Sequence, residues 1–293
     1  MSEFLEIDAP AKINLFLALT GKRGDGFNQL ISVISKLELK DTLKIRKSGK
    51  PGSLALTCPE YPDLETTQNL VAQAIDAWRK ESGENMGLEI VLDKKIPLEA
   101  GLGGGSSDAV AALLGVNSLS PDPLSEEKLL AIAAKIGSDC PVFLQPGICQ
   151  VEGRGELVTP LDLLGRCNQE ILLFRPPLGH PTGQIFQIFE EKGKYSEEDG
   201  ARKKIKQWQS GETALQDLIY NDLEQAVFSK YLYFAPLYEE IRNQFGLHSM
   251  LSGSGSASFS LLPQDFDRET DLRAMIMDSL GEEVWFCRTR LHS

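Results

Sequence analysis

The chain has 293 residues, of which 42% are hydrophobic and 25% charged, values typical of a folded globular protein and not of a disordered one. A chain of this length is expected to form about two domains with a full core. The formal net charge of −12 at pH 7 argues against a general nucleic-acid binder and a basic membrane-binding surface, because both need clustered cations facing phosphate.

In the first half of the chain, strand patterns alternate with helix patterns. Strands are predicted at Leu5–Asp8, Ile13–Leu19, Thr42–Lys47, Ser53–Thr57 and 88–92. The turn 48–52 predicts a hairpin between the third and fourth of these strands. Helices are predicted at 70–78, 106–117 and Ser125–Ile136, the last ended by Gly137.

The pattern changes near residue 159. Strands are predicted at Ile171–Phe174, His248–Leu251, Ala257–Leu262 and Glu283–Arg288, and helices at Gly183–Glu190, Tyr238–Phe245 and Asp267–Leu280. The order β-α-β-β-α-β predicts a split-βαβ domain. The segment Glu190–Lys206 carries charges of both signs, which predicts a solvated insertion. We therefore expect one domain over residues 1–158 and a second over residues 159–293.

The cysteines and the N-terminus bear on location. The five cysteines are dispersed: Cys58, Cys140, Cys149, Cys167 and Cys287. With no C-x-x-C pair and three histidines, a zinc site is not expected. An odd cysteine count behind an acidic, signal-free start predicts reduced thiols and a cytoplasmic protein. No apolar stretch approaches about 18 residues, so no membrane span is expected.

The most informative segment is a glycine-rich stretch between a predicted strand and a predicted helix. It reads Ile96-Pro-Leu-Glu-Ala-Gly101-Leu-Gly-Gly-Gly105-Ser-Ser-Asp-Ala109. Glycines let the backbone turn tightly and approach a ligand. The start of the following helix offers unpaired N–H groups and about +0.5 charge. Together these features predict a phosphate site, with the hydroxyls of Ser106 and Ser107 able to cap the helix, contact phosphate or ligate Mg²⁺.

Two common phosphate motifs are incomplete in this stretch. A P-loop needs a lysine after its glycines, and the dinucleotide fingerprint needs a glycine where Ser106 stands. A flexible glycine turn with a capped helix is therefore an alternative interpretation. A second run, Leu251-Ser-Gly253-Ser-Gly255-Ser-Ala257, also follows a predicted strand, and its alternative is a surface linker.

Three motifs in order resemble the GHMP kinases, which include galactokinase, homoserine kinase and mevalonate kinase. Ala9–Leu15 resembles the first motif, Pro97–Ala109 the ATP-phosphate loop, and Leu251–Ala257 the third. This resemblance spans nearly the whole chain. It implies an α+β fold with an N-terminal ATP-binding domain and a C-terminal ferredoxin-like domain, and it implies ATP and Mg²⁺ as cofactors, with the metal held through Ser106 or Ser107. The residues it assigns to ATP are Pro97, Leu98, Glu99, Ala100, Gly101, Leu102, Gly103, Gly104, Gly105, Ser106 and Ser107, joined by Gly253, Ser254 and Gly255 of the third motif.

Further segments are similar to one branch of these kinases, which phosphorylates the 2-hydroxyl of 4-diphosphocytidyl-2-C-methyl-D-erythritol in the non-mevalonate route to isoprenoid precursors. They are Gly21–Phe27, Gly137–Phe143 and Asn221–Glu224. The resemblance implies Lys12 and Asp139 as the catalytic pair. A carboxylate can accept the proton of the attacking hydroxyl, and a lysine can stabilise the charge that develops. The alternatives are a surface lysine at a strand end and a helix-capping aspartate.

The resemblance also implies how the substrate is bound. Phe27 and Phe186 are expected to stack on the cytosine, with core packing as the alternative for each. Asn14 and Thr182 match positions expected to contact the substrate. Asn28 stands where the branch usually has a histidine expected to read the cytosine edge; an amide offers both a donor and an acceptor, so pairing with cytosine is retained as an expectation.

Two other functions remain open from the sequence alone. One is a GHMP kinase for another small alcohol, of the homoserine or mevalonate type, with Asn28 marking the change. The other is a non-catalytic nucleotide-binding module, for which a catalytic pair would be unnecessary. Glu99 is expected to point outward, because a carboxylate facing phosphate would repel it. The expected partner is a small molecule carrying a cytidine diphosphate group, with no nucleic acid and no membrane, and the chain is expected to be a monomer or weak homodimer.

Overall fold

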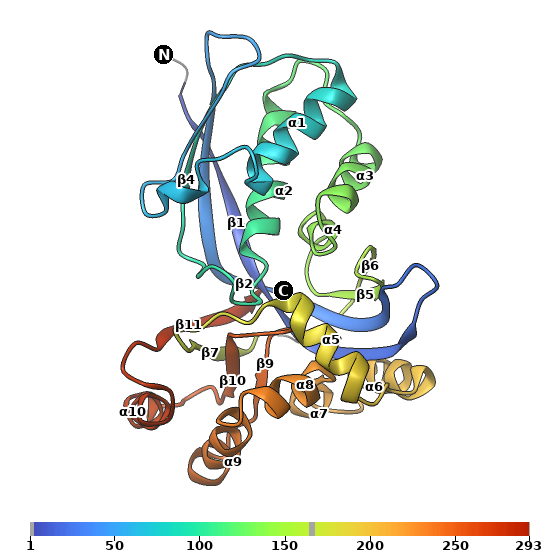
Figure 1. The fold of residues 1–293 in the computed structure, drawn as a ribbon, viewed down its shortest axis with the longest axis vertical. Coiled ribbons are helices and arrows are strands. Elements are labelled where there is room, and N and C mark those ends of the chain that lie inside the picture. The colour runs from blue at the N-terminus through green and yellow to red at the C-terminus, as the bar shows by residue number, and fades with distance from the viewer. Residues whose placement is uncertain (1–2, 164–167, 293) are drawn as a thin grey trace. The chain divides into compact units, whose positions relative to one another are not determined.

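The computed structural model describes residues 3–163 and 168–292 (Figure 1). Cys167 lies outside the described residues. The chain forms two compact units that are not consecutive in sequence: residues 1–11, 39–98 and 103–145 make the first, and residues 12–38, 99–102 and 146–293 make the second. The long strands β1 (Leu5–Lys22) and β2 (Asn28–Lys47) contribute residues to both units. The expected boundary between residues 158 and 159 stays a prediction.

The first unit combines a small sheet with helices α1 (Leu70–Ser82), α2 (Gly104–Leu119), α3 (Glu126–Ile136) and the short α4 (Cys140–Phe143). A 3-10 turn, η1 (Pro62–Leu64), precedes α1. Asn69 begins α1 with a side-chain cap on Val71 N, and Gly83 ends it in the left-handed conformation. Trp78 of α1 is fully buried and donates to Asn117 of α2 at 2.9 Å. This hydrogen bond satisfies the indole N–H inside the core between the two helices.

The predicted hairpin between residues 42–47 and 53–57 is wrong. Strand β4 (Leu88–Asp93) lies between β2 and β3 (Leu54–Thr57), antiparallel to β2 and parallel to β3. The turn 48–52 instead bonds to the segment before β4, since Ser48 N donates to Gly87 O and Gly52 N to Asn85 O. A side chain at Gly87 would lie 1.9 Å from Lys50 O, so the close approach that opens the hairpin requires a glycine there.

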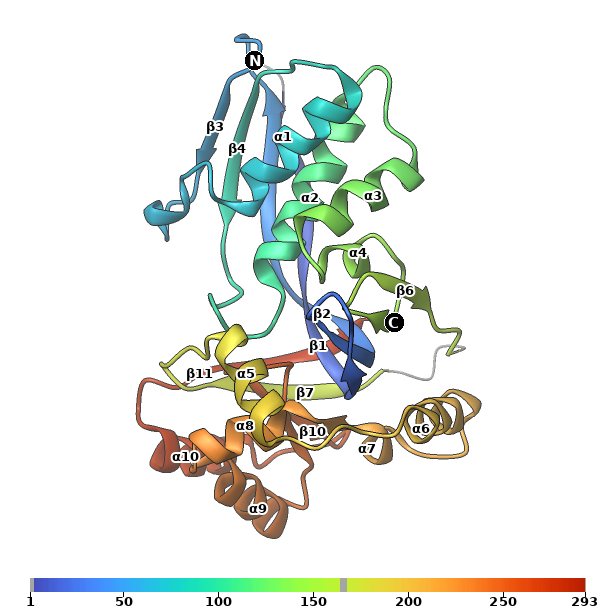
Figure 2. The same cartoon turned by 45° about the vertical axis from the view of Figure 1, so that its right-hand side comes forward.

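The second unit contains the predicted split-βαβ arrangement, which is confirmed. Strands β7 (Glu170–Arg175), β9 (Ser249–Leu251), β10 (Ser258–Leu262) and β11 (Trp285–His292) form an antiparallel run in the order β11-β7-β10-β9. Counted along the chain this is the order 4-1-3-2 of a ferredoxin-like sheet. Helices α9 (Phe234–Phe245) and α10 (Glu269–Leu280) pack on it through a core that includes Phe174, Ile241 and Ile276 (Figure 2).

Several elements of the second unit were not predicted. They are β5 (Cys149–Gly153), β6 (Leu157–Pro160), α7 (Leu215–Leu218), β8 (Tyr220–Asn221) and α8 (Leu223–Lys230). The first half of β2 was also missed; it pairs with β5 over Leu30–Ile34. Polar residues such as Ser32 and Ser35 interrupt the apolar pattern that would have indicated a buried strand. Both are nevertheless buried in the structure. Helix α5 (Thr182–Lys192) is close to its predicted range.

The expectation of a solvated insertion over residues 190–206 is wrong for its second half. Residues Glu198–Ser210 form helix α6, in which Ala201, Ile205 and Trp208 are buried. The three residues are four and three positions apart, which places them on one face of the helix. Most other residues of the segment are charged or polar. The overall composition therefore did not indicate that the segment forms an amphipathic helix. Separately, no helix in the described part of the chain is both long and apolar enough to cross a membrane.

We expect Ile205→Ala to lower the free energy of unfolding by about 2–5 kcal/mol, because it leaves a cavity beneath α6. Ile205 is only 2% exposed. Lys203→Ala, on the exposed face of the same helix, is the matched control and should change stability by less than about 0.5 kcal/mol. Urea denaturation measures both. Equal, small effects would mean that the segment is a solvated insertion after all.

Candidate active site

The glycine-rich stretch leads from β4 into α2, and the helix starts earlier than predicted. Gly103 adopts the left-handed conformation and α2 begins at Gly104, so Ser106 and Ser107 lie inside the first turn and do not cap the helix. The glycines allow the chain to turn into the helix before the serines are reached. The N–H groups of the first turn lack acceptors within the helix, so this end remains suited to an anion.

A buried charge cluster in the first unit holds the two ends of this stretch. Lys94 Nζ lies 2.5 Å from Asp41 Oδ2 and 2.7 Å from Asp108 Oδ2, and the three side chains are at most 4% exposed. Asp41 Oδ1 also accepts from Ile96 N at 2.8 Å. The cluster therefore ties β2, the exit of β4 and α2 together. The ammonium group of Lys94 is thus paired with both carboxyl groups inside the first unit.

The cluster carries two carboxyl groups for one ammonium group. Desolvation and the charge of Asp41 together raise the pKa of Asp108 to about 7, against the opposing effect of Lys94. The pKa of Lys94 is also raised, because the two carboxylates outweigh its own desolvation. Near neutral pH, partial protonation of Asp108 therefore limits the buried net charge.

In the second unit, the structure brings together the first motif, the middle of the glycine-rich stretch and the third motif. Lys12 N donates to Leu102 O, and Ala257 N donates to Ala100 O, both at 2.9 Å. Ser252 Oγ donates to Gly101 O at 2.9 Å. Three segments far apart in the sequence are thus joined through their backbones, as one structural element.

Lys12 is 4% exposed and donates from Nζ to Asn14 Oδ1 at 2.8 Å. Asn14 in turn donates to Ser32 Oγ at 2.9 Å, and Ser32 donates to Phe16 O. This chain of hydrogen bonds fixes the orientation of the Asn14 amide. The alternative interpretation of Lys12 as an exposed surface lysine does not agree with this burial.

Thr182 and Ser254 lie side by side, with their hydroxyl oxygens 2.9 Å apart. His180 Nδ1 is 3.0 Å from Ser254 O, and burial lowers the pKa of His180. A side chain at Gly253 would meet Asn14 Oδ1 at 3.2 Å. The third motif therefore lies against two of the residues expected to contact the substrate.

Sequence reasoning assigned no role to Asn221 and Glu224, although it used their segment as a match. Asn221 Nδ2 donates to Leu251 O at 3.1 Å and to Gly253 O at 2.8 Å. Glu224 Oε1 accepts from Leu251 N at 2.9 Å. These two side chains hold the backbone of the third motif. The signal in the sequence was an asparagine just before α8 and a glutamate in its first turn.

The residues expected at the cytosine differ in their surroundings. Phe27 is 50% exposed, and the Arg154 guanidinium lies 5.2 Å from the centre of its ring. Phe186 is half-buried against a hydrophobic cluster that includes Phe189. Asn28 is buried: Nδ2 donates to Glu190 Oε1 at 3.1 Å and Oδ1 accepts from Tyr195 at 2.9 Å. Neither partner of Asn28 was foreseen, because both are more than 160 residues away.

Asp139 belongs to the first unit and precedes α4, where it is half-buried. Its side chain makes no capping hydrogen bond to α4, in contrast to the alternative interpretation. The side chain of the neighbouring Cys140 is hydrogen-bonded to Ser106, and desolvation raises the pKa of the Cys140 thiol to about 11. The start of α4 therefore packs against the first turn of α2.

The remaining parts of the stretch fit the expectations in part. Glu99 is exposed, as expected for a carboxylate near phosphate, and has a positive φ of 54°. Ser107 Oγ is buried and has no hydrogen-bond partner among the described residues. The part of the chain that the structure describes holds no group of three or more His, Cys, Asp or Glu residues that could bind a metal. A hydroxyl that needs a partner is thus present at the start of α2.

Comparison with known proteins identifies relatives over nearly the full length of the chain. Residues 69–147 match the model of the GHMP kinase N-terminal domain. A 4-diphosphocytidyl-2-C-methyl-D-erythritol kinase of Desulfitobacterium hafniense is 35% identical, over 97% of this chain and 96% of the relative. The enzyme of the same name from Gloeobacter violaceus is 32% identical, over 98% of this chain and 94% of the relative.

Solved structures agree with these relatives. A 4-(cytidine 5'-diphospho)-2C-methyl-D-erythritol kinase superposes with a TM-score of 0.76 at 29% identity, covering 98% of this chain and 99% of that one. A homoserine kinase from Cytophaga hutchinsonii superposes with a TM-score of 0.75 at 17% identity, covering 99% of this chain and 96% of that one. The second likeness shows a shared fold only.

We expect Gly101→Ala to disrupt the joined backbone segments, because a Cβ there would lie 2.3 Å from Ser252 O and Gly101 has a φ of +77°. The loss in unfolding free energy should be about 1–3 kcal/mol. Gly105→Ala is the control: its Cβ would meet only Leu70 Cδ1, at 3.6 Å. Thermal and urea unfolding of both variants measure the difference. If Gly101→Ala is as stable as Gly105→Ala, the close approach of the two motifs is not a constraint.

Proposed function

The chain belongs to the 4-diphosphocytidyl-2-C-methyl-D-erythritol kinases, a family of GHMP kinases, and we propose that it transfers the γ-phosphoryl group of ATP to the 2-hydroxyl of 4-diphosphocytidyl-2-C-methyl-D-erythritol. The product would serve the non-mevalonate route to isoprenoid precursors. The observation that carries this proposal is the joining of Lys12, the segment 99–102 and the third motif through backbone hydrogen bonds. Motifs that only resembled the family by chance would have no reason to meet in space.

We assign the chemistry to Lys12 and Asp139. Phosphoryl transfer depends mainly on positioning and on neutralising charge, so few groups are needed. Asp139 would accept the proton of the 2-hydroxyl as the new bond to phosphorus forms. The Lys12 ammonium, kept in place by Asn14, would stabilise negative charge on the transferring oxygens. A tertiary alcohol is a poor nucleophile, which gives the proton acceptor a clear role.

The phosphates of ATP are assigned to the stretch 97–107 and to the third motif. The first-turn N–H groups of α2 would donate to phosphate oxygens. Of the two serines expected to hold Mg²⁺, Ser107 fits better. Its buried hydroxyl has no hydrogen-bond partner among the described residues, whereas Ser106 is hydrogen-bonded to Cys140. When bound, Mg²⁺ would neutralise charge on the ATP phosphates.

The cytidine end is assigned to Phe27 and Phe186, with Asn14 and Thr182 contacting the remainder of the substrate. The ring of Phe27 is exposed, as stacking on a base requires. The ring of Phe186 is partly buried, because it packs against the hydrophobic core. Asn28 uses one amide hydrogen and one oxygen lone pair within the protein. One further donor and one further acceptor position remain on the amide for the cytosine edge.

The alternatives from the sequence receive less support. A homoserine kinase superposes almost as well as the cytidyl-substrate enzyme, so the fold does not distinguish substrates. Identity of 32–35% along nearly the whole chain favours the cytidyl substrate. We also propose a cytoplasmic location, supported by the dispersed cysteines, of which Cys58, Cys140, Cys149 and Cys287 are free thiols. The expected monomer or weak homodimer stays a prediction.

The assay that tests the function uses purified protein, MgATP and a panel of alcohols, with ADP release and phosphorylated product measured together. We expect turnover of 4-diphosphocytidyl-2-C-methyl-D-erythritol and little turnover of homoserine or mevalonate. Turnover of either of those alcohols, without the cytidyl substrate, would refute the assignment. ATP binding without any turnover would support the non-catalytic module.

Asp139→Asn should lower kcat by about 10²- to 10⁴-fold, because the amide cannot accept the proton. ATP binding should be nearly unchanged, because the substitution is isosteric. Equilibrium binding of ATP and steady-state kinetics measure the two effects. An unchanged kcat would remove Asp139 from the mechanism.

Phe27→Ala should raise KM for the cytidyl substrate by about 5- to 150-fold, the range that corresponds to stacking on one ring. Because Phe27 is half exposed, stability should change little. Phe27→Tyr retains the ring and is the matched control. An increase in KM for ATP alone would contradict the stacking role.

A further inference from the structure

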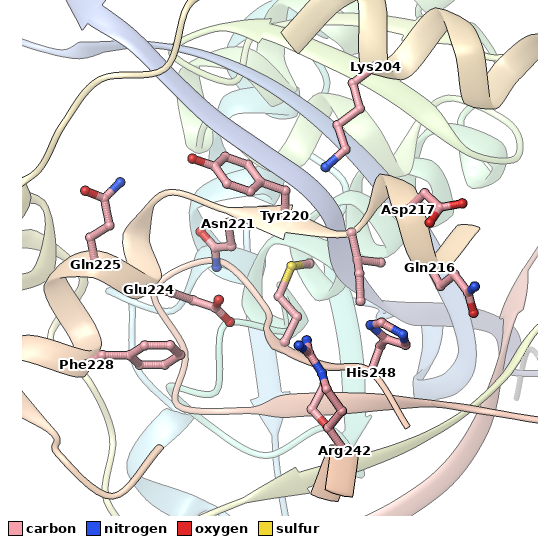
Figure 3. Close-up of a pocket in the computed structure, with 13 residues that line it drawn as sticks. Lys204, Gln216, Asp217, Tyr220, Asn221, Glu224, Gln225, Phe228, Arg242 and His248 are labelled. Atoms are coloured by element: carbon pink, nitrogen blue, oxygen red, sulfur yellow. The ribbon is translucent and has the colours of Figure 1, made fainter. Parts of the chain in front are cut away.

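The second unit contains a cavity that includes none of the residues proposed for catalysis or substrate binding. Its volume is about 470 Å³, within the range of small-molecule sites. It is lined from α6, α7, β8, α8, α9 and β9 (Figure 3). Asn221 and Glu224, which hold the third motif, are part of its wall.

The charges around the cavity favour an anion. Lys204 and Arg242 both line it. Arg242 forms no ion pair with any residue in the described ranges. Figure 3 shows its guanidinium directed away from α9, toward the side of the cavity where Glu224 lies. Asp217 is the opposing charge, and its carboxylate already accepts from Ala214 N.

Glu224 adds a donor instead of a second negative charge. Its Oε1 accepts from Leu251 N, and desolvation raises its pKa to about 8 in spite of that bond. At neutral pH the carboxyl is therefore mostly protonated, and its hydroxyl can donate to a ligand oxygen. Lys204, Asp217, Tyr220, Arg242 and His248 are the other titratable or charged residues of the wall.

The wall also has an apolar part. Ile219, Phe228 and Met250 line the cavity, together with the ring of Tyr220. Lys204 Nζ lies 5.3 Å from the centre of the Tyr220 ring and lends that face a positive charge. A ligand with both an oxyanion and a small apolar group matches this combination.

We propose that this cavity is a second ligand site, which binds a small organic molecule carrying a phosphate or carboxylate group beside an apolar group. Arg242 binds the oxyanion, Glu224 donates a hydrogen bond to it, and Phe228 and Met250 contact the apolar group, while Lys204 lies across the cavity from Arg242 (Figure 3) and adds to its positive potential. The cavity adjoins the third motif, because Asn221 and Glu224 both line the cavity and form hydrogen bonds with the backbone of that motif.

The test uses phenyl phosphate and benzoate as probes, with protein labelled at methionine methyl groups with ¹³C. Met250 is the one methionine among the residues that line the cavity, so its methyl resonance reports on the site. Met250→Leu assigns that resonance. We expect saturable shifts of the Met250 signal with at least one probe, and little shift of Met86, which belongs to the first unit. The probe that binds more tightly distinguishes a phosphate ligand from a carboxylate ligand.

Variants locate the binding. Arg242→Gln should weaken binding about 10- to 100-fold, because it removes a charge-assisted contact with the oxyanion. Lys204→Gln removes a charge from the far side of the cavity and should weaken binding less than Arg242→Gln does. Lys206→Gln removes the same charge from an exposed position of α6 that does not line the cavity, and should leave binding unchanged. Saturating MgATP should not abolish the Met250 shift.

The pH dependence provides a separate readout. Affinity of the wild-type protein should fall as pH rises through about 8, because Glu224 then becomes an anion that repels the probe. Glu224→Gln keeps a neutral donor and should lose this dependence. The proposal is overturned if neither probe shifts Met250, if Arg242→Gln binds the probe as tightly as the wild-type protein does, or if MgATP abolishes binding.

Discussion

The contacts of the buried Lys94 ammonium with Asp41 and Asp108 are the constraint on which the start of α2 and the exit of β4 depend. Such a cluster stabilises little in net terms, but removing Lys94 would leave the two buried carboxyl groups without a cation and would cost about 3–5 kcal/mol. The main effect of the cluster is to fix the positions of the segments that it joins. Asp41 holds the exit of β4 and Asp108 belongs to the second turn of α2, so the glycines between them are confined at both ends.

Local and repeated signals in the sequence predicted the parts of the fold that they control. The split-βαβ order followed from apolar periodicity, and the end of α3 followed from Gly137. The three motifs predicted the segments that meet around Gly101. These segments are joined by hydrogen bonds in the structure, whereas the roles of Lys12, Asp139, Phe27 and the other site residues are proposals. A motif indicates which residues are candidates for a site. Their positions are fixed by contacts between distant segments, such as the hydrogen bond from Ser252 Oγ to Gly101 O.

What the sequence could not predict depends on distant partners. The hairpin prediction failed because Gly87 allows the chain before β4 to approach Lys50 more closely than a local turn rule can indicate. Helix α6 was missed because three buried residues do not outweigh its charges in composition. Asn28 looked like a change in substrate reading, yet its amide is oriented by Glu190 and Tyr195, which only the folded chain brings near.

Strands β1 and β2 each pass from one compact unit into the other. β2 pairs with β5 through Leu30–Ile34 and with β4 through Thr42–Lys47. Because successive side chains of a strand face opposite sides, inserting one residue near Leu39 would preserve the first pairing and turn every side chain of the second to the wrong face. A change of length in the middle of β2 would therefore disturb the pairing in one unit whenever it preserved the pairing in the other.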